Sequence, residues 1–456
     1  MTKILRNNYL ILIIFLAGLA LRLYSLGSES IWYDEAYSVD ISSKDIIDIV
    51  RTVMGDNYEA NPPLYYILLH LWTGLTGNSE FSLRLLSAAM GSLCIVAVYA
   101  LGKKMFNKNT GLVAALILSV SVYHIQMSQE ARGYTLNVLL TIVSFYSLYT
   151  AVSKKNTKYT ALYIVSTILL LYTHYYGIFI LIAQNVFFLT VYLYNRGKKN
   201  TGFVRWVLIQ AVILISFIPA IRRLLIYRSD SLGSLWITEP TIERLGEYAV
   251  SYAGNFYLLV IFSFFTVAAL IGRARLAQIT AFRDDIDDSQ DRENEGMPYG
   301  LGAYMLMVWM VLPLLIPVIY SLVANPIFAS RYAIRSPVAF YLLAEYGIDC
   351  MKFKRVAFTA GLVVVMLSAP TLADYYSTPV KPQWRQVMNE IESNAKKGDI
   401  VTVYPGHELI TAIYYRTKED LIMVPVYDKF PEIPGTHRGN VWIITHSHPT
   451  NRRLFR

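Results

Sequence analysis

The sequence predicts an α-helical protein that crosses a membrane many times and ends in a small α/β domain. Of the 456 residues, 55% are hydrophobic and 16% are charged, and the mean hydropathy is +0.39. A water-soluble protein of this size is less apolar and more highly charged. Apolar runs of membrane-spanning length recur as far as residue 372, and short β-rich runs follow them. These observations predict a polytopic membrane protein.

About eleven apolar runs are long enough to cross the hydrocarbon core of a bilayer, which needs roughly 17 to 25 residues. They cover residues 9–26, 81–101, 111–128, 134–152, 159–173, 177–194, 206–226, 251–271, 301–323, 332–348 and 356–372. The first run is long for a signal peptide and lacks a cleavage site with small residues. We therefore predict that it is a membrane span.

The basic residues predict which side of the membrane each connection occupies. With the N-terminus in the cytoplasm, the cytoplasmic connections contain 19 Lys and Arg residues and the outer connections contain 9. Cytoplasmic loops carry such an excess. An odd number of spans then places the C-terminal domain on the extracytoplasmic face. The net charge of +9 comes from short clusters between apolar runs, so we expect contact with membrane lipids and no nucleic-acid partner.

The chain is predicted to divide into a transmembrane domain, residues 1–372, and an extracytoplasmic α/β domain, residues 373–456. Within the second domain, runs 400–404, 421–426 and 441–445 predict strands, and 384–395 and 408–416 predict helices. The charged loop 272–299 is predicted to be a flexible linker, with a metal site as the weaker alternative. The two cysteines, Cys94 and Cys350, lie in or beside apolar runs and imply no disulfide framework.

The first outer loop, residues 27–80, is acidic. It carries nine carboxylates against two basic residues, and Asp34 and Glu35 stand side by side after Trp32 and Tyr33. Neighbours on a helix diverge by about 100°, so these two acids do not face one site equally. One of them could act as a base while the other holds a helix end. A solvated acidic face at a helix start is the alternative.

Three further outer connections carry ionisable residues. Glu130 and Arg132 lie between the third and fourth predicted spans, where they pair with each other or serve a site that faces a cavity. Arg331 lies where the chain re-enters the membrane from outside, a place that a lipid phosphate would explain. His174 stands among aromatic residues, for which anchoring at the membrane surface is the favoured interpretation.

Four motifs follow one another on the outer connections. They are Trp32-Tyr33-Asp34-Glu35-Ala36, Asn61-Pro62-Pro63-Leu64-Tyr65-Tyr66, Ser128-Gln129-Glu130-Ala131-Arg132-Gly133-Tyr134 and Ser330-Arg331-Tyr332. Together they resemble the GT-C membrane glycosyltransferases, in particular the dolichyl-phosphate-mannose–protein mannosyltransferase-like group, which includes the lipid A aminoarabinose transferases. The similarity runs from Arg6 to about Asp349.

This resemblance implies a hexosyltransferase, mannosyltransferase-like, that moves a single sugar from a polyprenyl (dolichyl) phosphate donor to a protein, glycan or lipid acceptor on the extracytoplasmic face. It implies that Asp34 is the catalytic base, that Glu35 assists it and that Glu130 is a second acid. It also implies lipid-phosphate contacts at Arg132 and Arg331. The further substrate-binding residues that it implies are Tyr33, Asn61, His174 and Tyr332.

Cofactor use is only partly predicted. The sequence has no G-x-G-x-x-G pattern, so we expect no nucleotide cofactor. Asn61 stands where relatives often have a histidine before the two prolines, and this departure argues against a divalent metal. Because some relatives use a metal and others use none, a divalent metal stays possible and no metal ligand is assigned. A transporter or flippase of lipid-linked sugars is the alternative function. Such a protein is expected to carry charges inside its spans and broken helices near the midplane, whereas this chain carries its charges at the outer ends.

Overall fold

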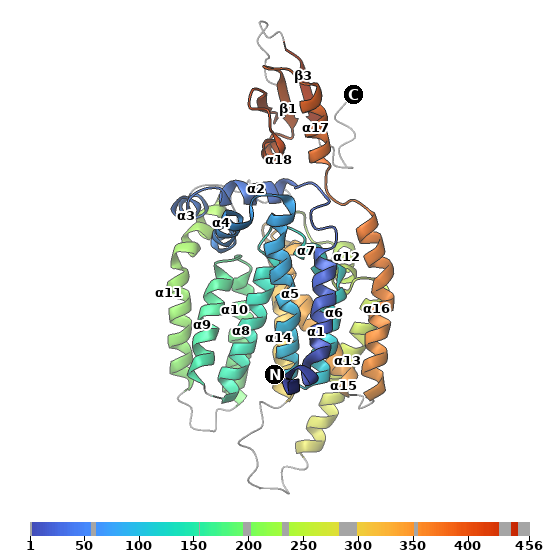
Figure 1. The fold of residues 1–456 in the computed structure, drawn as a ribbon. Coiled ribbons are helices and arrows are strands. Elements are labelled where there is room, and N and C mark those ends of the chain that lie inside the picture. The colour runs from blue at the N-terminus through green and yellow to red at the C-terminus, as the bar shows by residue number, and fades with distance from the viewer. Residues whose placement is uncertain are drawn as a thin grey trace.

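The computed structural model describes residues 2–55, 61–154, 156–194, 202–229, 237–281, 299–350, 354–427 and 439–445. In this part of the chain, long helices stand side by side in a bundle, and a small α/β unit lies at one end of it (Figure 1). The predicted fold class is confirmed. Of the predicted linker 272–299, the first part is helical and residues 282–298 lie outside the described residues.

Every predicted span falls on one or two helices of the bundle. These are α1 (Thr2–Leu23), α5 (Glu80–Met105), α6 (Lys108–Val120), α7 (Val122–Ser128), α8 (Tyr134–Lys154), α9 (Thr157–Leu171), α10 (Gly177–Tyr194), α11 (Gly202–Ser229), α12 (Ile242–Ala253), α13 (Phe256–Ala281), α14 (Tyr299–Val323), α15 (Ser336–Cys350) and α16 (Lys354–Ser377). By length and composition, four described helices could cross a membrane, or up to six if each of two bent pairs is one span. Shorter apolar helices lie at Tyr9–Leu23, Thr157–Leu171 and Gly177–Leu193.

Two predicted spans differ from single straight helices. The run 111–128 forms α6 and α7, which meet at an angle of 64°. Arg22 stabilises this break, because its guanidinium donates to the free carbonyls of Leu118 (3.1 Å) and Ser119 (3.2 Å) at the end of α6. The run 251–271 begins inside α12, which meets α13 at 85° beyond Gly254, a glycine with φ of +103°.

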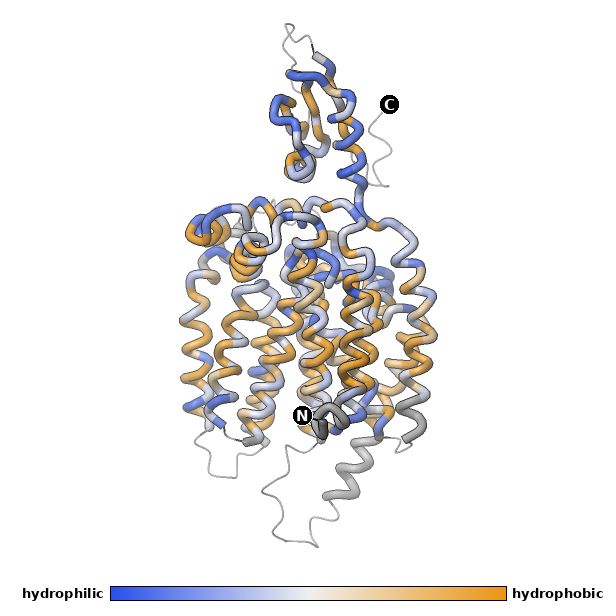
Figure 2. The backbone as a smooth tube through the Cα atoms, in the orientation of Figure 1, coloured by the Kyte–Doolittle hydropathy of each residue, from blue (hydrophilic) through white to orange (hydrophobic). Residues whose placement is uncertain are grey.

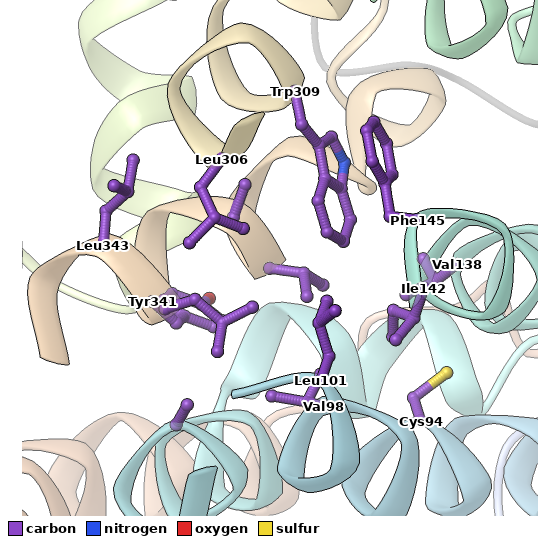
Figure 3. Close-up of a cluster of buried hydrophobic side chains, with 14 of the residues drawn as sticks. Cys94, Val98, Leu101, Val138, Ile142, Phe145, Leu306, Trp309, Tyr341 and Leu343 are labelled. Carbon is purple, nitrogen blue, oxygen red and sulfur yellow. The ribbon is translucent and has the colours of Figure 1, made fainter. Parts of the chain in front are cut away.

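Close packing of small and aromatic residues holds the bundle together. Phe145 of α8 stacks on Trp309 of α14 with ring centroids 4.4 Å apart (Figure 3). A Cβ atom on Gly347 of α15 would lie 1.9 Å from the backbone oxygen of Phe265, so α13 and α15 approach more closely than a larger residue allows. Apolar residues run along most of the length of the bundle helices (Figure 2), as a lipid environment requires.

Three short helices lie across one end of the bundle, and we call this end the outer face (Figure 1). They are α2 (Tyr33–Ser42), α3 (Ile46–Met54) and α4 (Leu64–Thr76), and η2 (Ser330–Ala333) comes from the connection between α14 and α15. Helix α3 is amphipathic and buries Ile49 and Val53. The N-terminal end of α1 lies at the opposite end of the bundle. That the outer face is extracytoplasmic stays a prediction.

The α/β elements above the outer face, residues 384–445, are called the C-terminal unit. It comprises α17 (Trp384–Asn394), β1 (Ile400–Tyr404), η3 (Gly406–Glu408), α18 (Leu409–Tyr415), β2 (Ile422–Pro425) and β3 (Val441–Thr445). The strands are parallel in the order β2-β1-β3. The predicted strands and helices of the tail are present. Helix α16 continues past residue 372 to Ser377, and the division of the chain into two domains at that residue stays a prediction.

Candidate active site

Asp34 forms a partly exposed ion pair at the start of α2. Its Oδ2 accepts a hydrogen bond from Nη1 of Arg331 in η2 at 2.8 Å. The side chains of Arg331 and Asp34 are 28% and 22% exposed. The guanidinium of Arg331 also lies 5.2 Å from the ring centroid of Trp32, within the range of a cation–π contact. A ligand at the outer face can therefore reach both charges of this pair.

Glu35 follows Asp34 in the chain, but its carboxylate is buried and has cations on both oxygens. Arg84 of α5 donates from Nε to Oε1 and from Nη2 to Oε2, both at 2.8 Å, and Nζ of Lys381 lies 3.1 Å from Oε2. The backbone N–H of Ala131 donates to Oε1 at 2.9 Å. Burial alone would raise the pKa of Glu35, but Arg84 and Lys381 lower it to about 2. This geometry favours a structural role over the predicted assistance in proton transfer.

Glu130 lies in the turn between α7 and α8 and is 6% exposed. Its Oε2 atom has no hydrogen-bond partner among the described residues. Burial raises the pKa of this carboxyl to about 7, and the positive charges of Lys381 and Arg331 limit the rise. A buried acid with a pKa near neutrality is able to exchange a proton at physiological pH.

Arg132 joins the same turn to α2 and α4. Its Nη1 donates to the backbone oxygen of Asp34 (3.3 Å), to Oγ of Ser38 (3.2 Å) and to the hydroxyl of Tyr66 (3.3 Å). Arg132 is 8% exposed. The structure thus brings Asp34, Glu130, Arg132 and Arg331 into one cluster at the outer face.

An aromatic group adjoins this cluster. The ring of His174, from the connection between α9 and α10, lies 4.7 Å from that of Tyr332 and 5.5 Å from that of Tyr176, centroid to centroid. Tyr176 donates its backbone N–H to Nδ1 of His174 at 3.2 Å. Burial lowers the pKa of His174 well below its usual value, because the charged imidazolium would lose its hydration. A neutral His174 fits a packing or substrate-contact role.

The remaining two predicted contact residues lie at the edges of the cluster. Tyr33 packs edge-on against His407 of η3, with ring centroids 5.0 Å apart, and therefore lies at the border with the C-terminal unit. Asn61 is partly buried in the turn before α4. That turn lies against the α9–α10 connection, because Leu64 donates its backbone N–H to the oxygen of Tyr172 at 3.1 Å.

A polar cavity of about 210 Å³ opens beside the cluster on the outer face. It is lined by Ser25, Ser28, Glu29, Ser30, Gln129, Tyr375, Tyr376, Ser377, Thr378, Pro379, Lys381, Pro382, Gln383 and Gln386. Gln129 and Lys381 belong both to this lining and to the surroundings of Glu35. Lys381 thus connects the wall of the cavity with the buried carboxylate of Glu35.

Sequence reasoning missed Arg84 and Lys381, the two cations that bind the carboxylate of Glu35. Arg84 lies inside a predicted span, and a charge in such a place is itself a signal of a functional site. Lys381 follows α16 and is 346 positions away from its partner Glu35, so no local pattern identifies it. Concerning metals, the described residues contain no group of three or more His, Cys, Asp or Glu side chains that could hold an ion.

Sequence comparison gives a partial family match. Residues 60–222 match the model of the family described as "Dolichyl-phosphate-mannose-protein mannosyltransferase". An uncharacterized protein of Aquifex aeolicus (strain VF5) is 29% identical over 198 residues, which cover 41% of this chain and 38% of that protein. The chain therefore matches less than half of this relative's length.

Comparison of structures extends the similarity to nine-tenths of the chain. ArnT from Cupriavidus metallidurans bound to undecaprenyl phosphate matches with a TM-score of 0.61 and 11% identity, over 92% of this chain and 87% of that one. The Archaeoglobus fulgidus oligosaccharyltransferase AglB, in complex with an inhibitory peptide and a dolichol-phosphate, gives a TM-score of 0.55 and 11% identity, over 91% and 64%. At such low identity these matches show a common fold, and it is the fold that the resemblance implies.

Proposed function

Because the chain has the fold of the GT-C membrane glycosyltransferases, we propose that it transfers one sugar from a polyprenyl-phosphate donor to an acceptor at the outer face. The family match and the two lipid-phosphate complexes of similar fold support this proposal. The observation that carries it is the partly exposed pair of Asp34 and Arg331, 2.8 Å apart. It supplies a carboxylate for an acceptor hydroxyl and a guanidinium for a phosphate in one place.

The proposed reaction is a single displacement at the anomeric carbon of the donor sugar. The acceptor oxygen forms a new bond to this carbon, the bond from the carbon to the phosphate oxygen breaks, and polyprenyl phosphate leaves with the electron pair. The acceptor proton passes to Asp34. Arg331 and Arg132 stabilise the charge that grows on the leaving phosphate. Such a displacement inverts the configuration of the sugar.

We propose that donor binding also frees the base. Arg331 donates to Asp34, and an arriving phosphate competes for this guanidinium. Once Arg331 turns to the phosphate, the Asp34 carboxylate is available to the acceptor hydroxyl. Glu130, whose pKa is about 7, can be protonated while the phosphate binds, which limits the repulsion between like charges.

The finer assignments are part of the same proposal. A mannosyl donor and transfer to a protein are the first to test, because they are the description of the family that residues 60–222 match. Glycan and lipid acceptors are the alternatives. The outer face is proposed to be extracytoplasmic, in keeping with the distribution of Lys and Arg in the sequence.

The direct test incubates the purified protein with dolichyl- or undecaprenyl-phosphate carrying labelled mannose, glucose or aminoarabinose, together with peptide, glycan or lipid acceptors. We expect free polyprenyl phosphate and a labelled acceptor to appear together. Asp34→Asn should slow the formation of both products by about 10²–10⁴, whereas Asp40→Asn, on an exposed position of the same helix, should leave it unchanged. Donor transport across vesicles without cleavage would instead identify a flippase, and absence of both activities in folded protein would reject the proposal.

A further inference from the structure

The linker between α16 and α17, residues 378–383, carries a lysine whose side chain lies beside the buried carboxylate of Glu35. Nζ of Lys381 donates to Oε2 of Glu35 and to the backbone oxygen of Gln129, both at 3.1 Å. The Lys381 side chain is 10% exposed and that of Glu35 is fully buried. Such a buried ammonium is desolvated at a cost, which is offset only where its partners are well placed. Its position is therefore fixed by these two contacts.

Lys381 and Glu35 hold the peptide groups on either side of Glu130. Lys381 binds the carbonyl of Gln129, and the Oε1 atom of Glu35 accepts from the N–H of Ala131 at 2.9 Å. Glu130 Oε2 has no hydrogen-bond partner among the described residues. The direction of the Glu130 carboxyl thus depends on how firmly the turn around it is held.

The linker that carries Lys381 is itself held in place by contacts with the first outer loop. Oε1 of Glu29 accepts from the backbone N–H of Val380 at 2.6 Å and of Lys381 at 3.4 Å. Farther along, Arg385 of α17 donates from Nη2 to Oε1 of Glu80 at 2.6 Å. The C-terminal unit and the loop that carries Asp34 are therefore joined on both sides of Lys381.

We propose that Lys381 is a positioning residue for sugar transfer and that it makes the linker to the C-terminal unit an integral part of the active site. This inference rests on the proposed function. Lys381 acts through Glu35 and the turn at residues 129–131, and it does not touch the reacting atoms. The C-terminal unit accordingly contributes to sugar transfer, because its attachment orients Glu130 and Arg132.

The first test replaces Lys381 by methionine, which keeps the length of the side chain and removes its charge. We expect kcat to fall by about 10²-fold with little change in the donor KM, since a displacement of about 1 Å at a catalytic group has an effect of that size. Lys381→Arg keeps the charge and should restore part of kcat. Lys397→Met changes an exposed lysine of the C-terminal unit and should leave kcat unchanged.

The pH dependence of the transfer rate distinguishes a positioning role of Lys381 from a role in stability alone. The charged groups that act on Glu130 are Lys381 from the linker, Arg331 from η2, and Glu35 and Asp34 from α2. Loss of the Lys381 charge raises the pKa of Glu130, so the pH-rate limb that depends on Glu130 should move to higher pH in Lys381→Met. It should move less in Lys381→Arg, and the shift should vanish when Glu130 is replaced by Gln.

Hydrogen exchange of the turn gives a result that does not depend on activity. Amides of residues 129–132 should exchange faster in Lys381→Met than in the wild type or in Lys397→Met. If the wild type transfers no sugar but this exchange increases, the proposed function fails while the structural part of the inference stands. Unchanged kcat, pH profile and exchange in Lys381→Met would overturn the inference. If that variant does not fold, Glu29→Ala, which releases the linker alone, should show the same faster exchange, and unchanged exchange there overturns it.

Discussion

Two neighbouring acids of α2 each pair with an arginine, and the two pairs differ in the number of contacts and in their exposure to solvent. Asp34 and Arg331 share one contact of 2.8 Å and are both partly exposed. Glu35 and Arg84 share two contacts of 2.8 Å, and their side chains are 0% and 2% exposed. The first pair can exchange its partner for a ligand, whereas the second pair cannot separate without leaving a charge buried and unpaired.

The contrast follows from helix geometry. Consecutive side chains on a helix point about 100° apart, so one of the two acids faces the outer surface and the other faces the bundle. Glu35 also accepts from the N–H of Trp32 at 3.4 Å, as the third residue of a capping box does at a helix start. We call Glu35 and Arg84 the closed pair, and Asp34 and Arg331 the open pair. The closed pair fixes the first turn of α2, and this turn holds the Asp34 side chain of the open pair at the outer face.

The largest effect is expected for Asp34→Asn. The amide keeps the size of the side chain and can still accept a bond from Arg331, but it cannot take the acceptor proton. Turnover should fall by about 10²–10⁴ while donor binding survives. Asp40→Asn on the same helix is the matched control for sugar-transfer assays. Near-complete activity in Asp34→Asn combined with its loss in Glu130→Gln would move the role of base to Glu130.

Breaking the closed pair should instead affect stability. Glu35→Gln leaves Arg84 without a charged partner on α2, and removal of one member of a buried pair costs about 3–5 kcal/mol. We expect a lower melting temperature in detergent and a lower yield of folded protein. Asp40→Asn is the comparison. It breaks the exposed pair of Asp40 and Lys44, 3.3 Å apart, and should cost at most about 0.5 kcal/mol of stability. Equal melting temperatures for both variants would contradict the proposed division of roles.

Replacing the arginine of the open pair should weaken donor use. Arg331→Ala removes a charge-assisted contact to the donor phosphate, worth about 1.5–3 kcal/mol, or roughly 10- to 100-fold in donor affinity. Arg331→Lys should recover only part of this affinity, since an ammonium lacks the planar fork of a guanidinium. Binding of labelled undecaprenyl phosphate to the purified variants measures the effect. Unchanged affinity in Arg331→Ala would remove Arg331 from the phosphate site.

Most of the fold could be predicted from the sequence because bilayer thickness sets the length of apolar runs. Strands 400–404 and 441–445 were also predicted at their observed bounds. The breaks at 64° and 85° could not be read from hydropathy. Polar side chains such as Arg22 compensate the freed carbonyls at the first break, and a hydropathy average does not register a single buried cation.

The predicted site was limited by contacts between distant parts of the chain. The motifs identified Asp34, Glu130, Arg132 and Arg331, which do lie together, and their catalytic roles stay predictions. The different environments of Asp34 and Glu35 followed from helical geometry, but which of them faces inward did not. That distinction depends on Arg84 and Lys381, and Lys381 is joined to the site only by the tertiary structure.

The smallest expected effect concerns the pH dependence of stability, where the two buried acids act in opposite directions. The pKa of Glu35 is lowered from an ordinary value of 4.5 to about 2, so its stabilising contribution is complete above about pH 4.5 and is lost as the pH falls toward 2. The pKa of Glu130 is raised from 4.5 to about 7. Between these two values the folded protein binds more protons at Glu130 than the unfolded chain does, so stability decreases as the pH rises from about 4.5 to 7.

Glu130→Gln isolates this contribution, because the amide cannot ionise and occupies nearly the same volume. We expect the melting temperature of the variant in detergent to gain on that of the wild type by a few degrees as the pH rises from about 4.5 to 7, and to keep a constant difference above that range. A curve for Glu130→Gln that runs parallel to that of the wild type would mean that Glu130 titrates near its ordinary pKa. The buried carboxyl would then be ionised throughout the working range, and it could not relieve the charge of an arriving phosphate.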